Sequence, residues 1–228
     1  MTTLWQKLMK KPVEEVAAEL QIYNPLQFKI GDPVKIDLFD DGVDLSRINF
    51  TVIGIQVVTR EIDGRDYKMV DYDVLGRTLD NQSYRRTLRL IPLENPDAEV
   101  THGVILLRQL DGFGYNQAFH EGLDFSRNGG EFKEGDKTYY RPNVAGTQEM
   151  VKTPWEAVTT SVCDEDRNGK VDPNEIRTGR LTYWDFGNEF KNDANQSYIE
   201  WYIVNMDGNG YLTIMIGPEV DLGRISMI

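Results

Sequence analysis

The sequence is poor in the residues that most often carry catalysis. Its 228 residues include one cysteine, Cys163, and two histidines, His102 and His120, so an internal disulfide is excluded. It contains no histidine spacing typical of a zinc site, no glycine-rich phosphate loop and no nucleophile elbow. The single thiol lies beside Asp164 and near Glu165, and a negative field disfavours the reactive thiolate. We therefore predict no catalytic and no organic-cofactor residue, and a structural role for Cys163.

Positive charge and long apolar runs are also scarce. The sequence has 25 Lys and Arg against 37 Asp and Glu, a formal net charge of −12. Nucleic-acid binders need a surplus of Lys and Arg, and an anionic membrane surface repels an acidic protein. No run reaches the roughly 18 apolar residues that span a bilayer, and the first residues lack the apolar region of a signal peptide. We expect a soluble cytoplasmic protein that neither binds nucleic acid nor inserts into a membrane.

From Pro33 onward the sequence is rich in β-branched and aromatic runs separated by turn residues. The dipeptide Asp63-Gly64 is a strong turn signal, and it predicts a hairpin between strands over 50–62 and 66–76. Further strands are expected in VKIDLF (34–39), YRRTLRLIPL (84–93), GVILLRQL (103–110), KTYYR (137–141), LTYWDF (181–186), SYIEWYIVNM (197–206) and YLTIMIG (211–217).

The apolar pattern of the first hairpin predicts two details. In the outgoing strand the apolar phase slips between Val52 and Ile53, which indicates a bulge near Gly54 or burial on both faces. In the return strand apolar and acidic residues alternate, which predicts one buried and one wet face. The alternating residues are Val70, Asp71, Tyr72, Asp73 and Val74.

Helical patterns are confined to two places. Apolar residues recur at helical spacing before residue 22, where Pro12 suits a first helical turn, and YNQAFHEGL at 115–123 has the character of a short helix. No helix-rich crossovers separate the strands, so antiparallel pairing is favoured over a parallel α/β sheet. The predicted fold class is mainly β (α+β): an antiparallel, strand-rich domain with short N-terminal helices.

The expected domain organisation is an N-terminal helical segment at 1–25 followed by a β-rich body at 26–228, with a candidate subdivision near 95–130. Two similar six-residue segments in the sequence are relevant to that subdivision. KIGDPV at 29–34 resembles KEGDKT at 133–138. Two related β-rich halves are therefore an alternative to a single undivided body.

One stretch, CDEDRNGKVDPNEI at 163–176, has recognisable site chemistry. Residues 164–175 fit the twelve-residue calcium loop, with Gly169 at the sharp turn and Val171 at the apolar eighth position. Ca²⁺ takes 6–8 oxygen ligands, and alternate residues of a tight turn direct their oxygens inward. The predicted ligands are Asp164, Asp166, Asn168, the backbone carbonyl of Lys170, Asp172 and Glu175, the last with both carboxylate oxygens.

A metal-free polar turn is the competing interpretation, because Asp, Asn and Gly also dominate ordinary turns. Such a turn does not need four acidic side chains, which repel one another without a cation. The flanking TPWE and DPNE resemble helix caps, whereas AVTTSVC is a poor helix former and Gly179 ends any helix that follows Glu175. We predict a Ca²⁺ loop placed between short or non-helical elements.

NMDGNGYLTI repeats the calcium-loop pattern in part. Asn205, Asp207, Asn209 and Gly210 fit the first, third, fifth and sixth positions, but Ile216 stands where the bidentate carboxylate belongs. The dipeptide Asn-Gly is itself a hairpin signal. We predict a metal-free hairpin over residues 205–216.

Short pieces of the chain resemble the YjfK-like family of uncharacterised bacterial proteins. They are FKIGDPVKID (28–37), GDKTYYR (135–141), LTYWDF (181–186) and above all the ending YLTIMIGPEVDLGRISMI (211–228). The resemblance implies a soluble, mostly β bacterial protein with a role in protein interaction. It carries over no catalytic residue, and the calcium-type loop is not a motif of that family.

Two hypotheses about function follow. The first is a non-enzymatic binding or assembly protein, with another protein as partner and one structural Ca²⁺ in the DxDxNG loop. The alternative is an enzyme of unknown reaction, such as a hydrolase, with a cleft lined by aromatic side chains and carboxylates. A pocket with convergent polar groups would favour the enzyme.

Overall fold

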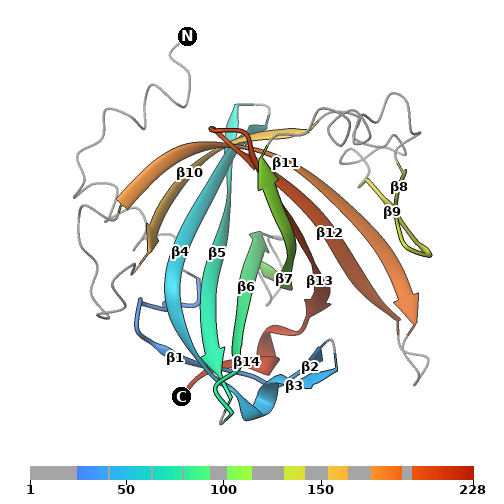
Figure 1. The fold of residues 1–228 in the computed structure, drawn as a ribbon. Helices are drawn as coiled ribbons and strands as arrows, with labels where there is room; N and C mark the ends of the chain where they lie inside the picture. Colours follow the sequence, from blue (N-terminus) through green and yellow to red (C-terminus); the bar gives the residue numbers. More distant parts are fainter. Residues whose placement is uncertain are drawn as a thin grey trace. The chain divides into compact units, whose positions relative to one another are not determined.

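The computed structural model describes residues 25–40, 42–62, 64–78, 80–92, 102–114, 131–141, 154–163, 176–191 and 197–228 (Figure 1). The helices predicted before residue 22 and over 115–123 lie outside these residues. Within them there is no α-helix, only the 3₁₀ turns η1 (Leu45–Arg47) and η3 (Leu222–Arg224). No helix of the described residues is long and apolar enough to cross a membrane. The predicted antiparallel, strand-rich fold is confirmed.

The strands expected from β-branched and aromatic runs are present in the described residues, except that the run at 34–39 is divided between β1 and β2. In chain order the strands of the described residues are β1 (Pro33–Ile36), β2 (Phe39–Asp40), β3 (Val43–Asp44), β4 (Asn49–Ile62), β5 (Arg65–Arg77), β6 (Ser83–Pro92), β7 (His102–Gly114), β8 (Glu131–Glu134), β9 (Lys137–Tyr140), β10 (Trp155–Cys163), β11 (Ile176–Lys191), β12 (Ser197–Asp207), β13 (Tyr211–Val220) and β14 (Ile225–Met227).

The β4–β5 hairpin has the predicted turn and the predicted bulge. Ile62 pairs with Arg65 across a two-residue connection, and Gly64 has a positive φ of 77°, which a glycine adopts without strain. The register shifts between Val52 and Gly54, so one residue of β4 is unpaired. This bulge reconciles the two apolar phases of β4, because it lets residues on both sides of the slip face the same core.

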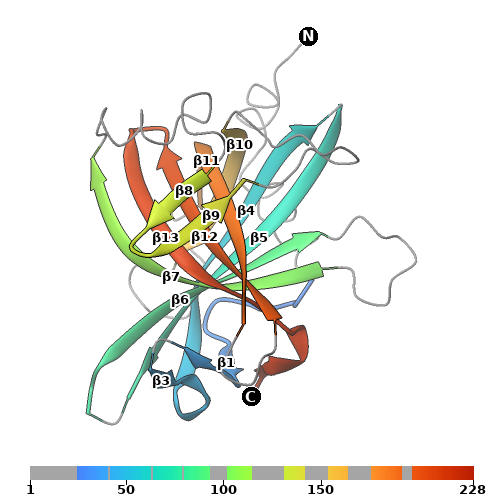
Figure 2. The same ribbon diagram turned by 90° about the vertical axis from the view of Figure 1, so that its right-hand side faces the viewer.

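The chain divides into two compact units, and each is described by itself. Unit 1 holds residues 1–106, 158–179 and 220–228, and unit 2 holds residues 107–157 and 180–219. The strand order in unit 1 is β14-β1-β4-β5-β6-β7, with β10 also pairing with β4. The order in unit 2 is β7-β13-β12-β11-β9-β8 (Figure 2). The chain passes between the units within β7, β10 and β11, and again before the last residue of β13.

Each unit has its own apolar cluster. In unit 1 the buried face of β5, formed by Val70, Tyr72 and Val74, packs with side chains of β4 and β6, as the alternation predicts. In unit 2 the cluster is more aromatic. Its buried members are Tyr139, Trp184, Phe186, Tyr202, Val204, Leu212, Ile214 and Ile216.

The echo between KIGDPV and KEGDKT coincides with a similar turn in each unit. Gly31 has φ 92° and Gly135 has φ 60°, and in both places an aspartate follows and a strand begins within two residues. The shared letters therefore reflect turn chemistry that each site requires locally.

Close packing makes Gly76 of β5 difficult to replace. A methyl group there would collide with Ile48 Cγ2 and would lie 2.9 Å from Phe50 Cδ1. We expect Gly76→Ala to lower the free energy of unfolding by about 1–3 kcal/mol through overpacking. Gly114→Ala is the control, because nothing lies within 4 Å of that added methyl. Equal losses for the two variants in chemical denaturation would contradict this account.

Candidate functional site

All six predicted calcium ligands lie outside the described residues. Asp164, Asp166, Asn168, Lys170, Asp172 and Glu175 fall between Cys163, the last residue of β10, and Ile176, the first residue of β11. The structure therefore describes the two ends of the loop but not the positions of its ligands.

The loop ends belong to successive strands that pair with each other. β10 reaches Cys163, β11 starts at Ile176, and the two strands are hydrogen-bonded neighbours. The prediction that the loop lies between non-helical elements is confirmed on both sides. The resemblance of TPWE to a helix cap is not accompanied by a helix, because Trp155 and Glu156 already belong to β10. The β-branched run of β10 extends instead as a strand along β4.

The last described residue before the loop, Cys163, lies against a glycine of β4. Cys163 pairs with Gly54 of β4, and Gly54 in turn pairs with Asp73 of β5. A Cβ on Gly54 would lie 3.4 Å from the Cβ of Asp73 and 3.5 Å from the carbonyl oxygen of Val162. The glycine at the bulge thus lets β10 and the Asp73 side chain approach closely.

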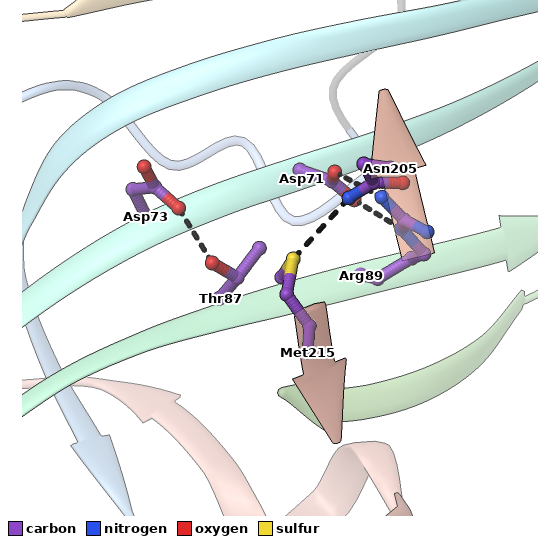
Figure 3. Close-up of polar contacts among 6 residues, drawn as sticks. All are labelled: Asp71, Asp73, Thr87, Arg89, Asn205 and Met215. Carbon is purple, nitrogen blue, oxygen red and sulfur yellow. Dashed lines mark hydrogen bonds and ion pairs between the residues drawn. The ribbon is translucent and has the colours of Figure 1, made fainter. Parts of the chain in front are cut away.

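Asp73 accepts two hydrogen bonds from β6. The Thr87 hydroxyl donates to Oδ1 at 2.6 Å (Figure 3), and Arg85 donates to Oδ2 at 2.5 Å. The carboxylate of Asp73 raises the pKa of Arg85, burial opposes the rise, and Cys163 lies near enough to add to it. The residue before the loop therefore lies within electrostatic reach of a guanidinium as well as of its acidic neighbours.

A buried ion pair lies on the same face of β5 as Asp73, two residues earlier in the strand. Arg89 of β6 donates from Nε to Asp71 Oδ1 at 2.8 Å and from an NH2 group to Oδ2 at 2.7 Å (Figure 3). Their side chains are only 2% and 7% exposed. The prediction of a wet face for the acidic residues of β5 is thus wrong at Asp71, because this face is covered as well. A bidentate partner makes burial of the carboxylate tolerable.

Unit 2 holds a second carboxylate cluster, next to its aromatic residues. Glu200 of β12 accepts from the Tyr139 hydroxyl at 2.5 Å and from the Lys137 amine at 2.9 and 3.2 Å. The Tyr139 ring lies 5.6 Å from that of Tyr202. Burial and the hydrogen bond to Glu200 raise the pKa of Tyr139, and burial raises the pKa of Tyr202. Both phenols are therefore held in the protonated form.

A third carboxylate, Asp185 of β11, orders a buried arginine. Its Oδ1 accepts from Arg141 at 2.5 Å and from the Trp155 indole at 2.9 Å. The Arg141 guanidinium also lies 5.7 Å from the Trp155 ring and 5.9 Å from the Phe186 ring. These contacts suit a cation held in place by a carboxylate and two aromatic faces.

The partial echo at 205–216 forms the predicted hairpin. Asp207 Oδ1 accepts from the backbone N–H groups of Asn209 at 2.9 Å and Tyr211 at 2.8 Å, and Gly210 has φ 79°. Asn205 instead donates across to Met215 Sδ at 3.3 Å (Figure 3). The carboxylate of Asp207 therefore accepts hydrogen bonds from the backbone of its own turn.

The described residues contain no group of three or more His, Cys, Asp or Glu side chains suited to a metal ion. The described residues do contain three polar clusters, around Asp71 and Asp73, around Glu200 and around Asp185, and none of them was predicted from the sequence. One signal was present: DYD on β5 and RRTLR on β6 alternate with opposite charges on strands joined by a short connection. The unit 2 clusters join residues about sixty and forty positions apart, and no local pattern reports such contacts.

Comparison with protein-family models, with curated proteins and with solved structures gives no match. The resemblance to the YjfK-like family therefore stays a prediction.

The buried ion pair gives a double-substitution test. We expect Arg89→Met alone to lower the free energy of unfolding by about 3–5 kcal/mol, because it leaves the Asp71 carboxylate buried without its partner. Adding Asp71→Leu should restore most of that loss, since two apolar residues replace the pair. Arg47→Met is the control, because Arg47 is 85% exposed in its pair with Asp44 and should change stability little. If the double variant is as unstable as Arg89→Met, the effect is not the unpaired charge.

The raised pKa values of Tyr139 and Tyr202 predict loss of stability in alkali. Their contribution to the free energy of unfolding is complete below pH about 10, the ordinary value, and is lost as the pH rises through the folded values. In a titration of tyrosinate absorbance, we expect at least two of the 11 tyrosines to ionise only after the others. Tyr139→Phe should remove one of the late transitions. An unchanged number of late transitions in that variant would contradict the assignment.

Proposed function

We propose that the chain is a non-enzymatic binding or assembly protein whose loop at 164–175 binds one structural Ca²⁺. The observation that supports this best is the geometry of the loop ends. Two paired strands enter and leave the twelve residues that carry the calcium-loop pattern. A cation that draws Asp164, Asp166, Asp172 and Glu175 together would close this connection and relieve the repulsion among four carboxylates.

A structural role follows from what flanks the loop. Calcium sensors act by swinging two helices apart to expose an apolar groove. Here β10 lies against β4 through Val158–Cys163, and β11 lies against β12 through Leu181–Lys191. Strands held by a ladder on their other side have little freedom to swing. We therefore assign the ion to rigidity and not to switching.

The enzyme alternative draws support from the tyrosines, tryptophans and carboxylates gathered in unit 2. Against it, Glu200 is held by Lys137 and Tyr139, and Asp185 by Arg141 and Trp155. Donors then occupy both oxygens of Glu200 and the Oδ1 atom of Asp185, so these atoms are already hydrogen-bonded and not free to take a proton from a substrate. We favour a structural role for both carboxylates.

The remaining parts of the proposal concern the setting of the protein. The acidic composition and the absence of a surplus of Lys and Arg support a partner other than nucleic acid, and we propose another protein. We propose a cytoplasmic location because the single cysteine, which cannot form an internal disulfide, is compatible with a reducing compartment.

Calcium should stabilise the protein without exposing apolar surface. At 100 times the dissociation constant, one ion adds about 2.7 kcal/mol to the free energy of unfolding by mass action. We expect a higher melting temperature in calcium than in chelator, with no change in binding of a hydrophobic dye. Glu175→Gln should remove most of the shift, because the bidentate ligand is lost.

Asp207→Asn is the matched control, because it removes an acid of the partial motif and should leave the calcium shift intact. An identical melting temperature with and without calcium in the parent protein would reject the site. A shift accompanied by new dye binding would keep the site and reject the structural role.

A further inference from the structure

Five strands of unit 2 place one row of residues across the sheet. Gly187 of β11 pairs with Tyr140 of β9 on one side and with Trp201 of β12 on the other. Trp201 then pairs with Gly217 of β13, and Tyr140 with Glu131 of β8. Side chains that are paired in register point to the same face of a sheet. The row therefore sets two aromatic residues on one face, with a glycine on each side of the tryptophan.

The glycines allow the indole to lie against the sheet. A Cβ on Gly187 would lie 3.4 to 3.5 Å from three carbons of the Trp201 ring, so the ring covers this glycine. Any larger residue at 187 would have to share that space. Tyr140, two strands away, is 46% exposed, so its ring is available to solvent. The result is an aromatic platform: Trp201 laid on Gly187, with Tyr140 beside it.

Acidic residues surround the platform. Glu189 pairs with Ile199, and alternation puts both on the face that carries Gly187 and Trp201. Glu219 lies two residues beyond Gly217 on the same face, and both glutamates are exposed. With Glu131 they give three carboxylates; among the side chains that the structure describes here, Lys133 is the ammonium close to them, 4.0 Å from Glu131. The platform is therefore aromatic in its centre, with exposed carboxylates around it.

Glu219 and Trp201 are close neighbours. Burial raises the pKa of Glu219, and the Trp201 indole lowers it, although the indole N–H has no partner at hydrogen-bond geometry. The carboxylate thus lies beside the ring without being fixed by it.

We propose that this platform, formed by Tyr140, Trp201, Ile199, Glu131, Glu189 and Glu219, binds a basic peptide segment of a partner protein. A guanidinium or ammonium group stacks on an aromatic face, and the surrounding carboxylates complete its pairing. The charge of the patch and the net charge of −12 both favour a cationic partner. The inference rests on the proposed binding function, but it does not require the calcium loop.

The test uses acetyl-tetraarginine amide as the probe and acetyl-tetraglutamine amide as the neutral control, with affinity measured by calorimetry on the full chain. We expect the arginine peptide alone to bind. Tyr140→Leu should weaken its binding about two- to fivefold, the ratio that corresponds to an exposed cation–aromatic contact. Tyr140 is the first choice because its exposure makes misfolding of the variant improbable, whereas Trp201 packs on Gly187.

A charge-matched pair of variants separates the platform from general acidity. Glu189→Gln and Glu61→Gln each remove one exposed carboxylate, the first at the platform and the second in unit 1. Only Glu189→Gln should weaken binding. Equal effects of the two, or no effect of Tyr140→Leu, would overturn the proposal, as would absence of binding. Binding of a neutral glucose hexasaccharide that depends on Tyr140 would also overturn it, in favour of a sugar ligand. Retention of peptide binding by Glu175→Gln would show that this surface stands even if the calcium site fails.

Discussion

The register of the β4–β5 hairpin is the constraint on which unit 1 depends. Side chains alternate across a strand, so a slip of one residue would move every apolar side chain of β5 to the opposite face. The two-residue turn at Gly64 sets this register at one end. The bulge between Val52 and Gly54 then resets it, so that Phe50 and Val52 reach the same apolar cluster as Ile55 and Val57. Without the bulge one half of β4 would bury polar residues.

The same register brings charge into a covered face. Because apolar residues occupy one face of β5, Asp71 and Asp73 must occupy the other. On β6, Arg89 donates hydrogen bonds to Asp71, and Thr87 and Arg85 donate to Asp73. A buried carboxylate costs several kcal/mol in lost hydration, and a bidentate guanidinium offsets most of that cost. The pair therefore contributes more to a unique register than to net stability. A slipped hairpin would leave both charges buried without a partner.

Local chemistry in the sequence predicts much of this fold, and distance along the chain explains what it does not predict. The turns at Asp63-Gly64 and at residues 207–210, the bulge near Gly54 and most strands follow from patterns within a few residues. The wet face assigned to Asp71 was wrong because alternation shows which residues share a face, not whether a second layer covers it. Contacts such as Tyr139 to Glu200 join distant strands, and no short pattern encodes them. For the predicted calcium loop the sequence supplies the spacing of the candidate ligands, and the structure adds the two strands that hold the ends of the loop.

The strands at the loop ends also limit what an ion could do there. A ligand shifts a conformational equilibrium only when two states exist and it prefers one of them. β10 is held along β4, and β11 is held along β12, and strand ladders in register do not have a second arrangement close in energy. Calcium bound between Cys163 and Ile176 would then change the order of the loop and the stability of the fold, but it would have no second arrangement of these strands to select. The proposed platform on β8, β9, β11, β12 and β13 depends on strand register alone, so its chemistry would be the same with the loop empty or occupied.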